Sequence, residues 1–163
     1  MLFRSQGFGE PGRTVLMGGS AGGFTALGAI AADPTRFAAA AVAYPVTDLA
    51  DLTERSHRFE RHYTDTLVGA LPAAADEYHR RSPVWHADRF VHRPLLVLHG
   101  DADPVVPVEQ SRVFVDRVRA AGGDATLHVY EDEGHGFRQR ANQLDEFERI
   151  GTFLDRVLGG RGR

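Results

Sequence analysis

Residues 14–24 are Thr14-Val15-Leu16-Met17-Gly18-Gly19-Ser20-Ala21-Gly22-Gly23-Phe24, an apolar run that passes through glycines and a serine into a second small-residue run. A short apolar run closed by glycine predicts a buried strand over 14–18. The Ala-rich run over 21–32 predicts a helix that stops before Pro34, because the residue preceding a proline disfavours helical backbone. The stretch therefore indicates a strand, a sharp turn at Ser20 and a helix.

The same alternation continues along the chain. Further apolar runs predict strands over 38–44, 95–100 and 126–130. Apolar residues spaced by three and four predict helices over 108–121 and 144–157. Near-continuous apolar strands between helices are typical of a parallel sheet covered on both faces. We therefore expect an α/β fold with about four parallel strands flanked by helices, and a mixed polar and aromatic insertion over 46–93 whose helices the pattern does not delimit.

Composition excludes several classes of function. Lysine plus arginine number 19 and aspartate plus glutamate 22, and the resulting net charge of −3 lacks the basic excess of a nucleic-acid-binding protein. Positive and negative side chains also balance within the insertion, which predicts a solvated surface there. The absence of cysteine excludes disulfides and a cysteine nucleophile. Histidines and carboxylates lack the spacing of a zinc site, so we expect neither a metal nor another cofactor.

Two features bear on location. No apolar run approaches the ~20 residues that a membrane-spanning helix needs, so we expect no membrane partner. The first seven residues, Met1-Leu2-Phe3-Arg4-Ser5-Gln6-Gly7, lack the basic start and apolar stretch of a signal peptide. From these features we expect a cytoplasmic protein.

The turn at Ser20 matches a nucleophile motif. Gly18-Gly19-Ser20-Ala21-Gly22 fits G-x-S-x-G between a strand and a helix, which is the context that this motif requires. Such a turn exposes the serine oxygen above the sheet, and the N–H of Ala21 then points to where an oxyanion would form. The alternative interpretation is a serine that only caps the helix. A phosphate-binding loop does not fit, because the chain has no lysine.

A serine nucleophile needs a base and a residue that orients the base. Two loops at the carboxyl ends of predicted strands supply candidates, since residues 99–107 contain Asp103 and residues 131–137 contain His135. Parallel strands bring these ends to one edge of the sheet. The chain order serine, aspartate, histidine is the order of α/β-hydrolases. The three residues together therefore predict a Ser20–Asp103–His135 triad.

Two neighbours of Asp103 compete for the same role. We prefer Asp103 to Asp101 because Asp103 lies further from the end of its strand, directly before the turn Pro104-Val105-Val106-Pro107. His99 ends the strand itself, and we expect it to pack or bond locally.

Five segments together carry a family resemblance. They are Gly18-Gly19-Ser20-Ala21-Gly22-Gly23-Phe24, Tyr44-Pro45-Val46-Thr47-Asp48, Ser82-Pro83, Pro94-Leu95-Leu96-Val97-Leu98-His99-Gly100 with Asp103 and Val106-Pro107, and Glu133-Gly134-His135-Gly136-Phe137. This series resembles the C-terminal part of the catalytic domain of the prolyl oligopeptidase family, and most of all its acylaminoacyl-peptidase and dipeptidyl-peptidase branches. The resemblance covers nearly the whole chain, and it implies an α/β-hydrolase fold and a serine peptidase that hydrolyses short peptides through an acyl-enzyme.

The resemblance also implies roles for individual residues. Ser20 would be the nucleophile, His135 the general base and then acid, and Asp103 the residue that orients His135. The N–H of Ala21 would be one oxyanion donor. The candidates for the pocket that holds the side chain before the scissile bond are Phe59, Tyr63 and Val106, and the alternative is that these three are simple core residues.

The family pattern sets expectations about extent as well. We expect residues 1–163 to be a partial α/β-hydrolase domain, the C-terminal half of the fold, with the last four of its strands. The family's β-propeller is absent from this sequence, as is the loop with a second oxyanion donor, usually a tyrosine hydroxyl. The first strand would then be an open apolar sheet edge, which favours self-association. Two alternatives to a peptidase stay open, namely an esterase that acts on small esters and an inactive truncated fragment.

Overall fold

The computed structural model describes residues 12–55 and 61–159. Its elements are, in chain order, β1 (Val15–Gly19), α2 (Ala21–Ala32), β2 (Ala39–Ala43), α3 (Leu49–Arg55), α4 (Arg61–Val68), α5 (Ala75–Arg81), the 3-10 helix η1 (Pro83–Phe90), β3 (Leu95–Gly100), α6 (Val108–Ala120), β4 (Ala125–Tyr130) and α7 (Arg140–Leu158).

The strands form one parallel sheet in the order β1-β2-β3-β4. The predicted α/β fold with four parallel strands is confirmed, and each predicted strand lies within one residue of its observed bounds. Helix α7 begins at Arg140, before its first large apolar residue. Helix α6 ends as predicted at its glycines, since Gly122 has a φ of 91° that reverses the chain after the last turn.

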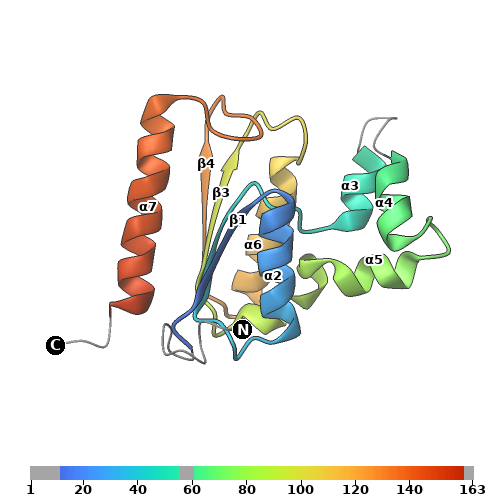
Figure 1. Ribbon diagram of the computed structural model, residues 1–163, viewed down its shortest axis with the longest axis horizontal. Helices are drawn as coiled ribbons and strands as arrows, with labels where there is room; N and C mark the ends of the chain where they lie inside the picture. The colour runs from blue at the N-terminus through green and yellow to red at the C-terminus, as the bar shows by residue number, and fades with distance from the viewer. Residues whose placement is uncertain (1–11, 56–60, 160–163) are drawn as a thin grey trace, which may run out of the picture.

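Helices cover both faces of the sheet (Figure 1). Alternate residues of each strand point to opposite faces, so Leu95 and Val97 of β3 pack with α2, α6 and η1, whereas Leu96 and Leu98 pack beneath α7. Strands β2 and β3 are buried along their whole length. The two apolar clusters hold the sheet between the helix layers, and the carboxyl ends of all four strands meet at one edge.

The first three helices of the insertion form a separate group beside the sheet, whereas η1 packs in the core with α2 and α6. Helices α3, α4 and α5 lie to the right of α2 in Figure 1. A third apolar cluster, with Tyr78 of α5 and Val106 of the loop after β3 among its buried members, joins this group to the rest of the molecule. The insertion therefore lies next to the loops at the carboxyl edge of the sheet.

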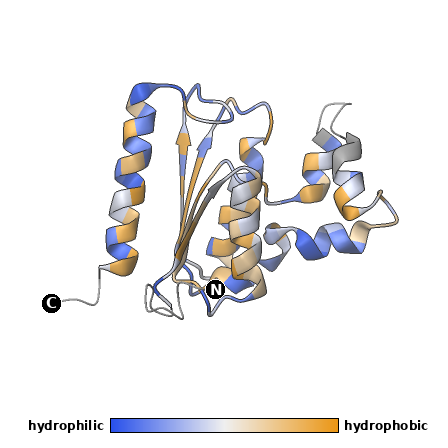
Figure 2. Ribbon diagram, viewed as in Figure 1, coloured by the Kyte–Doolittle hydropathy of each residue, from blue (hydrophilic) through white to orange (hydrophobic). Residues whose placement is uncertain are grey.

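Helix α7 is amphipathic, as predicted, but only part of its apolar sequence faces the sheet. Bands of hydrophobic and hydrophilic residues alternate along it (Figure 2). Phe153, Ile150 and Val157 contact the sheet cluster, whereas Phe147 is 71% exposed and Leu144 54% exposed. Among the helices of the described ranges, none has the length and apolarity to cross a bilayer.

Candidate active site

Ser20 lies at the tip of the turn between β1 and α2. Its φ of 55° and ψ of −124° are costly for a residue with a side chain, and such strained backbone is concentrated at functional sites. The backbone N–H of Ser20 donates to the carbonyl oxygen of Ala43 at 3.0 Å, which fixes the turn to β2. Gly18 permits the sharp bend, because a Cβ there would lie 2.5 Å from the carbonyl carbon of Gly22.

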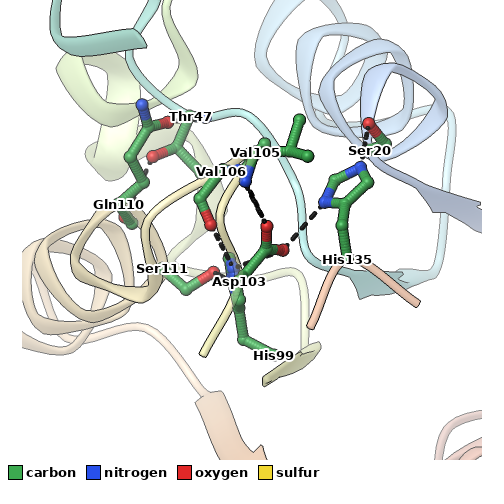
Figure 3. A network of polar contacts seen from close by, with 9 residues as sticks. All are labelled: Ser20, Thr47, His99, Asp103, Val105, Val106, Gln110, Ser111 and His135. Carbon is green, nitrogen blue, oxygen red and sulfur yellow. Dashed lines mark hydrogen bonds and ion pairs between the residues drawn. The ribbon is translucent and has the colours of Figure 1, made fainter. Parts of the chain in front are cut away.

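His135 stands between Ser20 and Asp103 (Figure 3). Its Nε2 lies 2.8 Å from Ser20 Oγ, and its Nδ1 lies 2.8 Å from Asp103 Oδ2. The ring of Tyr44 packs against the imidazole with a centroid separation of 4.7 Å. The three side chains that the sequence predicts to meet therefore form one chain of hydrogen bonds, although they come from loops up to 115 residues apart.

The carboxylate of Asp103 is fully buried and held by several donors. Its Oδ1 accepts the N–H groups of Val105 and Val106 at 2.8 and 2.9 Å. Burial alone raises the pKa of Asp103, but hydrogen bonds from His99, Val106, His135 and Val105 outweigh it and lower the pKa to about 2. Asp103 is therefore ionised near neutral pH.

The charge of Asp103 assigns the tautomer of His135. An ionised carboxylate can only accept hydrogen bonds, so Nδ1 of His135 carries the proton that points to Asp103. The lone pair of Nε2 is then free to accept the hydroxyl proton of Ser20. A serine held in this way can pass its proton to the imidazole while it attacks a carbonyl carbon.

Asp101 has a different role from Asp103. Its Oδ1 accepts the backbone N–H of Asp132 at 2.8 Å, so it ties the loop after β3 to the loop after β4. The side chain that contacts Nδ1 of His135 is that of Asp103.

His99 bonds locally, as its place at the end of β3 predicts. The ring is fully buried, with Nε2 2.9 Å from the carbonyl oxygen of Val106 and Nδ1 2.7 Å from Ser111 Oγ. Because a carbonyl oxygen only accepts, Nε2 is the protonated nitrogen, and it also lies 3.4 Å from Asp103 Oδ2. His99 thus connects the loop that carries Asp103 to helix α6.

Sequence reasoning missed Glu133, which supports the turn that carries His135. The side chain is 1% exposed and accepts the N–H groups of Arg138 and Gln139 at 2.8 and 2.9 Å, as well as the amide of Asn142 at 2.9 Å. Burial raises the pKa of Glu133, but these hydrogen bonds reverse the effect and leave the pKa below its ordinary value. The only sequence signal was its place in the Glu-Gly-His-Gly-Phe segment.

The other predicted site residues fall in different environments. Ala21 is the first residue of α2, where N–H groups of any helix lack intrahelical acceptors. Val106 is 1% exposed and packs in the cluster with Tyr78 rather than facing open space. Phe59 lies outside the described residues, and of Tyr63 the structure gives only its place in α4. A substrate pocket formed by Phe59, Tyr63 and Val106 therefore stays a prediction.

No group of three or more histidine or acidic side chains that could hold a metal ion occurs within residues 12–55 and 61–159.

Comparisons with known proteins agree on one family. The chain is 32% identical over 162 residues to dipeptidyl peptidase family member 6 of Caenorhabditis elegans, a match that covers 96% of this chain and 22% of the relative. It is 35% identical over 135 residues to the probable carboxylic ester hydrolase LipM of Mycobacterium tuberculosis, covering 74% of this chain and 31% of that protein.

A solved structure shares the fold. The puromycin-hydrolyzing peptidase of Mycobacterium tuberculosis superposes with a TM-score of 0.92 at 36% identity, over 99% of this chain and 24% of the peptidase. The chain thus spans between about a fifth and a third of the length of these proteins. The sequence model of the prolyl oligopeptidase family matches residues 2–161. With its four parallel strands, its covering helices and this match over nearly its whole length, the chain belongs to the prolyl oligopeptidase family.

Proposed function

We propose that the chain carries the catalytic triad of a serine peptidase that hydrolyses short peptides. The observation that carries the proposal is the continuous hydrogen-bonded series from Ser20 Oγ through His135 to the buried Asp103 carboxylate, with two contacts of 2.8 Å. This series supports the proposal, because acyl transfer by a serine needs a nucleophile, a base and an orienting residue within hydrogen-bond reach of one another.

The proposed reaction proceeds in two steps. Ser20 Oγ attacks the carbonyl carbon of the scissile bond while its proton moves to Nε2 of His135, and the tetrahedral intermediate places its oxyanion near the N–H of Ala21. His135 then gives the proton to the departing amine, and the C–N bond breaks to leave an acyl-enzyme. A water molecule, deprotonated by His135, releases the acid and restores Ser20.

The substrate class follows from relatives rather than from a visible pocket. The family match and the similarity to a dipeptidyl peptidase and to a puromycin-hydrolyzing peptidase favour a peptide bond next to a short acyl component. Because the chain spans only part of these proteins, the activity of the complete relatives comes to this chain as a proposal.

An esterase is the second candidate. The observation in its favour is the 35% identity to a probable carboxylic ester hydrolase. The same three residues can hydrolyse either bond, because an ester passes through the same tetrahedral and acyl-enzyme species.

A panel of peptidyl-anilides and short-chain p-nitrophenyl esters separates the two, with Ser20→Ala as the matched control. A peptidase releases aniline from at least one peptide, and its turnover falls by at least about 10³-fold in Ser20→Ala. Turnover of esters alone would instead establish the esterase. Turnover that persists in Ser20→Ala would reject the triad, and a folded chain without any turnover would identify an inactive fragment.

A further inference from the structure

The carboxylate of Asp103 faces two histidines, of which the proposed reaction uses only one. His135 Nδ1 lies 2.8 Å and His99 Nε2 3.4 Å from the same oxygen, Oδ2 of Asp103 (Figure 3). The other oxygen, Oδ1, accepts the N–H groups of Val105 and Val106. A carboxylate has about four acceptor positions, so these four N–H groups occupy all of them.

His99 also reaches the carboxylate through the backbone. Its Nε2 carries the proton and lies 2.9 Å from the carbonyl oxygen of Val106. The N–H of the same residue, Val106, donates to Asp103 Oδ1 at 2.9 Å. The N–H of His99 therefore restrains Asp103 in two ways, directly at Oδ2 and through Val106 at Oδ1.

Ser111 holds the opposite side of the His99 ring. Its Oγ lies 2.7 Å from Nδ1, and because Nδ1 is the unprotonated nitrogen, the hydroxyl donates. Ser111 is fully buried in the first turn of α6, next to Gln110. The side chain of Gln110 accepts the N–H of Thr47 at 2.9 Å and its carbonyl oxygen accepts the Thr47 hydroxyl at 2.9 Å, which fixes this turn to the loop after β2. The His99 ring is thus held between α6 and the loop of Asp103.

The burial of Asp103 makes the contact with His99 consequential. The side chains of both residues are fully buried. Burial raises the pKa of Asp103, and among the hydrogen bonds that lower it, the one from His99 contributes most. Without this donor, a buried charge and the carbonyl of Val106 would each lack a partner. We expect the carboxylate then to turn toward other donors, and Oδ2 would no longer face Nδ1 of His135.

We propose that His99, held by Ser111, is a positioning residue that fixes the Asp103 carboxylate in the orientation that accepts Nδ1–H of His135. The effect on Ser20 rests on the proposed function, whereas the orientation of Asp103 does not. The role needs the N–H of His99, and not only the volume of its ring, which distinguishes it from packing.

Two substitutions of His99 separate the N–H from the ring. His99→Phe keeps a ring without a donor, whereas His99→Gln keeps a donor for Asp103 and an acceptor for the Ser111 hydroxyl. Val118→Ala is the matched control, since Val118 is fully buried in α6 and packs in the cluster under α2 and α6. In chains that are folded by circular dichroism, we expect fluorophosphonate labelling of Ser20 to slow by about 10²-fold in His99→Phe, by less than about tenfold in His99→Gln and not at all in Val118→Ala.

A double-mutant cycle tests whether Ser111 acts through His99. Ser111→Ala alone should slow labelling by about tenfold, because the His99 ring loses one of its supports, and it should add nothing further in His99→Phe. If His99→Phe does not fold, Ser111→Ala decides the matter, since unchanged labelling in that variant would overturn the proposal.

Proton NMR reports the orientation of Asp103 without any reaction at Ser20. The Nδ1 proton of His135, in a hydrogen bond of 2.8 Å to a carboxylate, should resonate far downfield of the amide protons, and its loss in His135→Ala identifies it. The signal should persist in Val118→Ala and His99→Gln and move upfield or vanish in His99→Phe.

The two measurements distinguish this proposal from the proposed function. A wild type that shows the His135 signal but is not labelled would reject the peptidase, and the NMR comparison then decides the role of His99. Equal labelling of His99→Phe and wild type, equal slowing in Val118→Ala and His99→Phe, or a His135 signal unchanged in His99→Phe would each overturn the proposal.

Discussion

At the scale of single residues, the site depends on side chains that fix other side chains. A single hydrogen bond joins Ser20 to His135. The carboxylate of Asp103, in contrast, is fully buried and accepts hydrogen bonds from several donors. The sequence could supply Ser20, Asp103 and His135, because each follows a predictable strand. It could not supply Glu133 or the contact of His99 with Ser111, since these depend on how two loops and a helix meet.

The low pKa of Asp103 predicts a pH dependence of stability. Its pKa falls on folding from 3.8 to about 2, so its contribution is present above about pH 4 and is lost as the pH drops toward 2. Between pH 5 and pH 2 we expect the free energy of unfolding of the wild type to fall by about 2 kcal/mol more than that of Asp103→Asn. Urea unfolding across this range measures the difference, and parallel curves for the two proteins would refute it.

Glu133 should matter more than an exposed neighbour of the same type. Glu133→Gln turns one acceptor oxygen into a donor that faces other donors, which we expect to cost about 2 kcal/mol and to slow acylation of Ser20 by displacing the turn of His135. Glu131→Gln, at an exposed position of the same loop, should change stability by less than about 0.5 kcal/mol. Equal effects of the two substitutions in urea unfolding would contradict the role of Glu133.

At the scale of elements, apolar runs predicted the strands well because the sheet is covered on both faces. Strand β3 was delimited correctly since every residue of it is buried. The helices of the insertion could not be delimited, because α4 and α5 are short and α5 consists mostly of charged residues. Part of the apolar pattern of α7 was also misleading as a guide to burial, since Leu144 and Phe147 are exposed.

The close approach of backbone in the turn between β1 and α2 predicts opposite effects of alanine at two glycines. Gly18→Ala would force a Cβ to within 2.5 Å of the Gly22 carbonyl, so the start of α2 must shift and the reaction of Ser20 with an acylating probe should slow. Gly28→Ala, in the same helix with nothing within 4 Å, should instead gain up to about 1 kcal/mol from helix propensity and leave Ser20 unchanged. Thermal unfolding and probe kinetics on both variants check this, and a harmless Gly18→Ala would show that the close approach is not needed.

At the scale of the whole molecule, two apolar layers cover the two faces of the sheet. The loops at the carboxyl ends of its strands carry Ser20, Asp103 and His135. The layer under α2 and α6 contains Phe114, which is fully buried. Its ring packs edge-on against the ring of Phe90, with the two ring centroids 5.2 Å apart. The adjacent Val113 is 46% exposed. We therefore expect the free energy of unfolding to depend on Phe114, which faces the sheet, and hardly at all on Val113, which faces away from it.

Neighbouring substitutions in α6 test this layer. Phe114→Ala removes a buried ring and should cost about 3–5 kcal/mol, a large part of the stability of a domain of this size. Val113→Ala should change the free energy of unfolding by no more than about 0.5 kcal/mol. Urea unfolding of both variants provides the comparison, and similar losses would mean that α6 packs differently.

The central claim, that His135 and Asp103 activate Ser20 as a nucleophile, is tested most directly by labelling the full chain with a fluorophosphonate and locating the adduct by peptide mass spectrometry. Ser20→Ala and His135→Ala serve as folded controls, verified by circular dichroism. We predict a single adduct on Ser20 in the wild type, none in Ser20→Ala and at least about 10³-fold slower labelling in His135→Ala. A folded wild type that remains unlabelled, or an adduct that forms equally fast without His135, would contradict the claim.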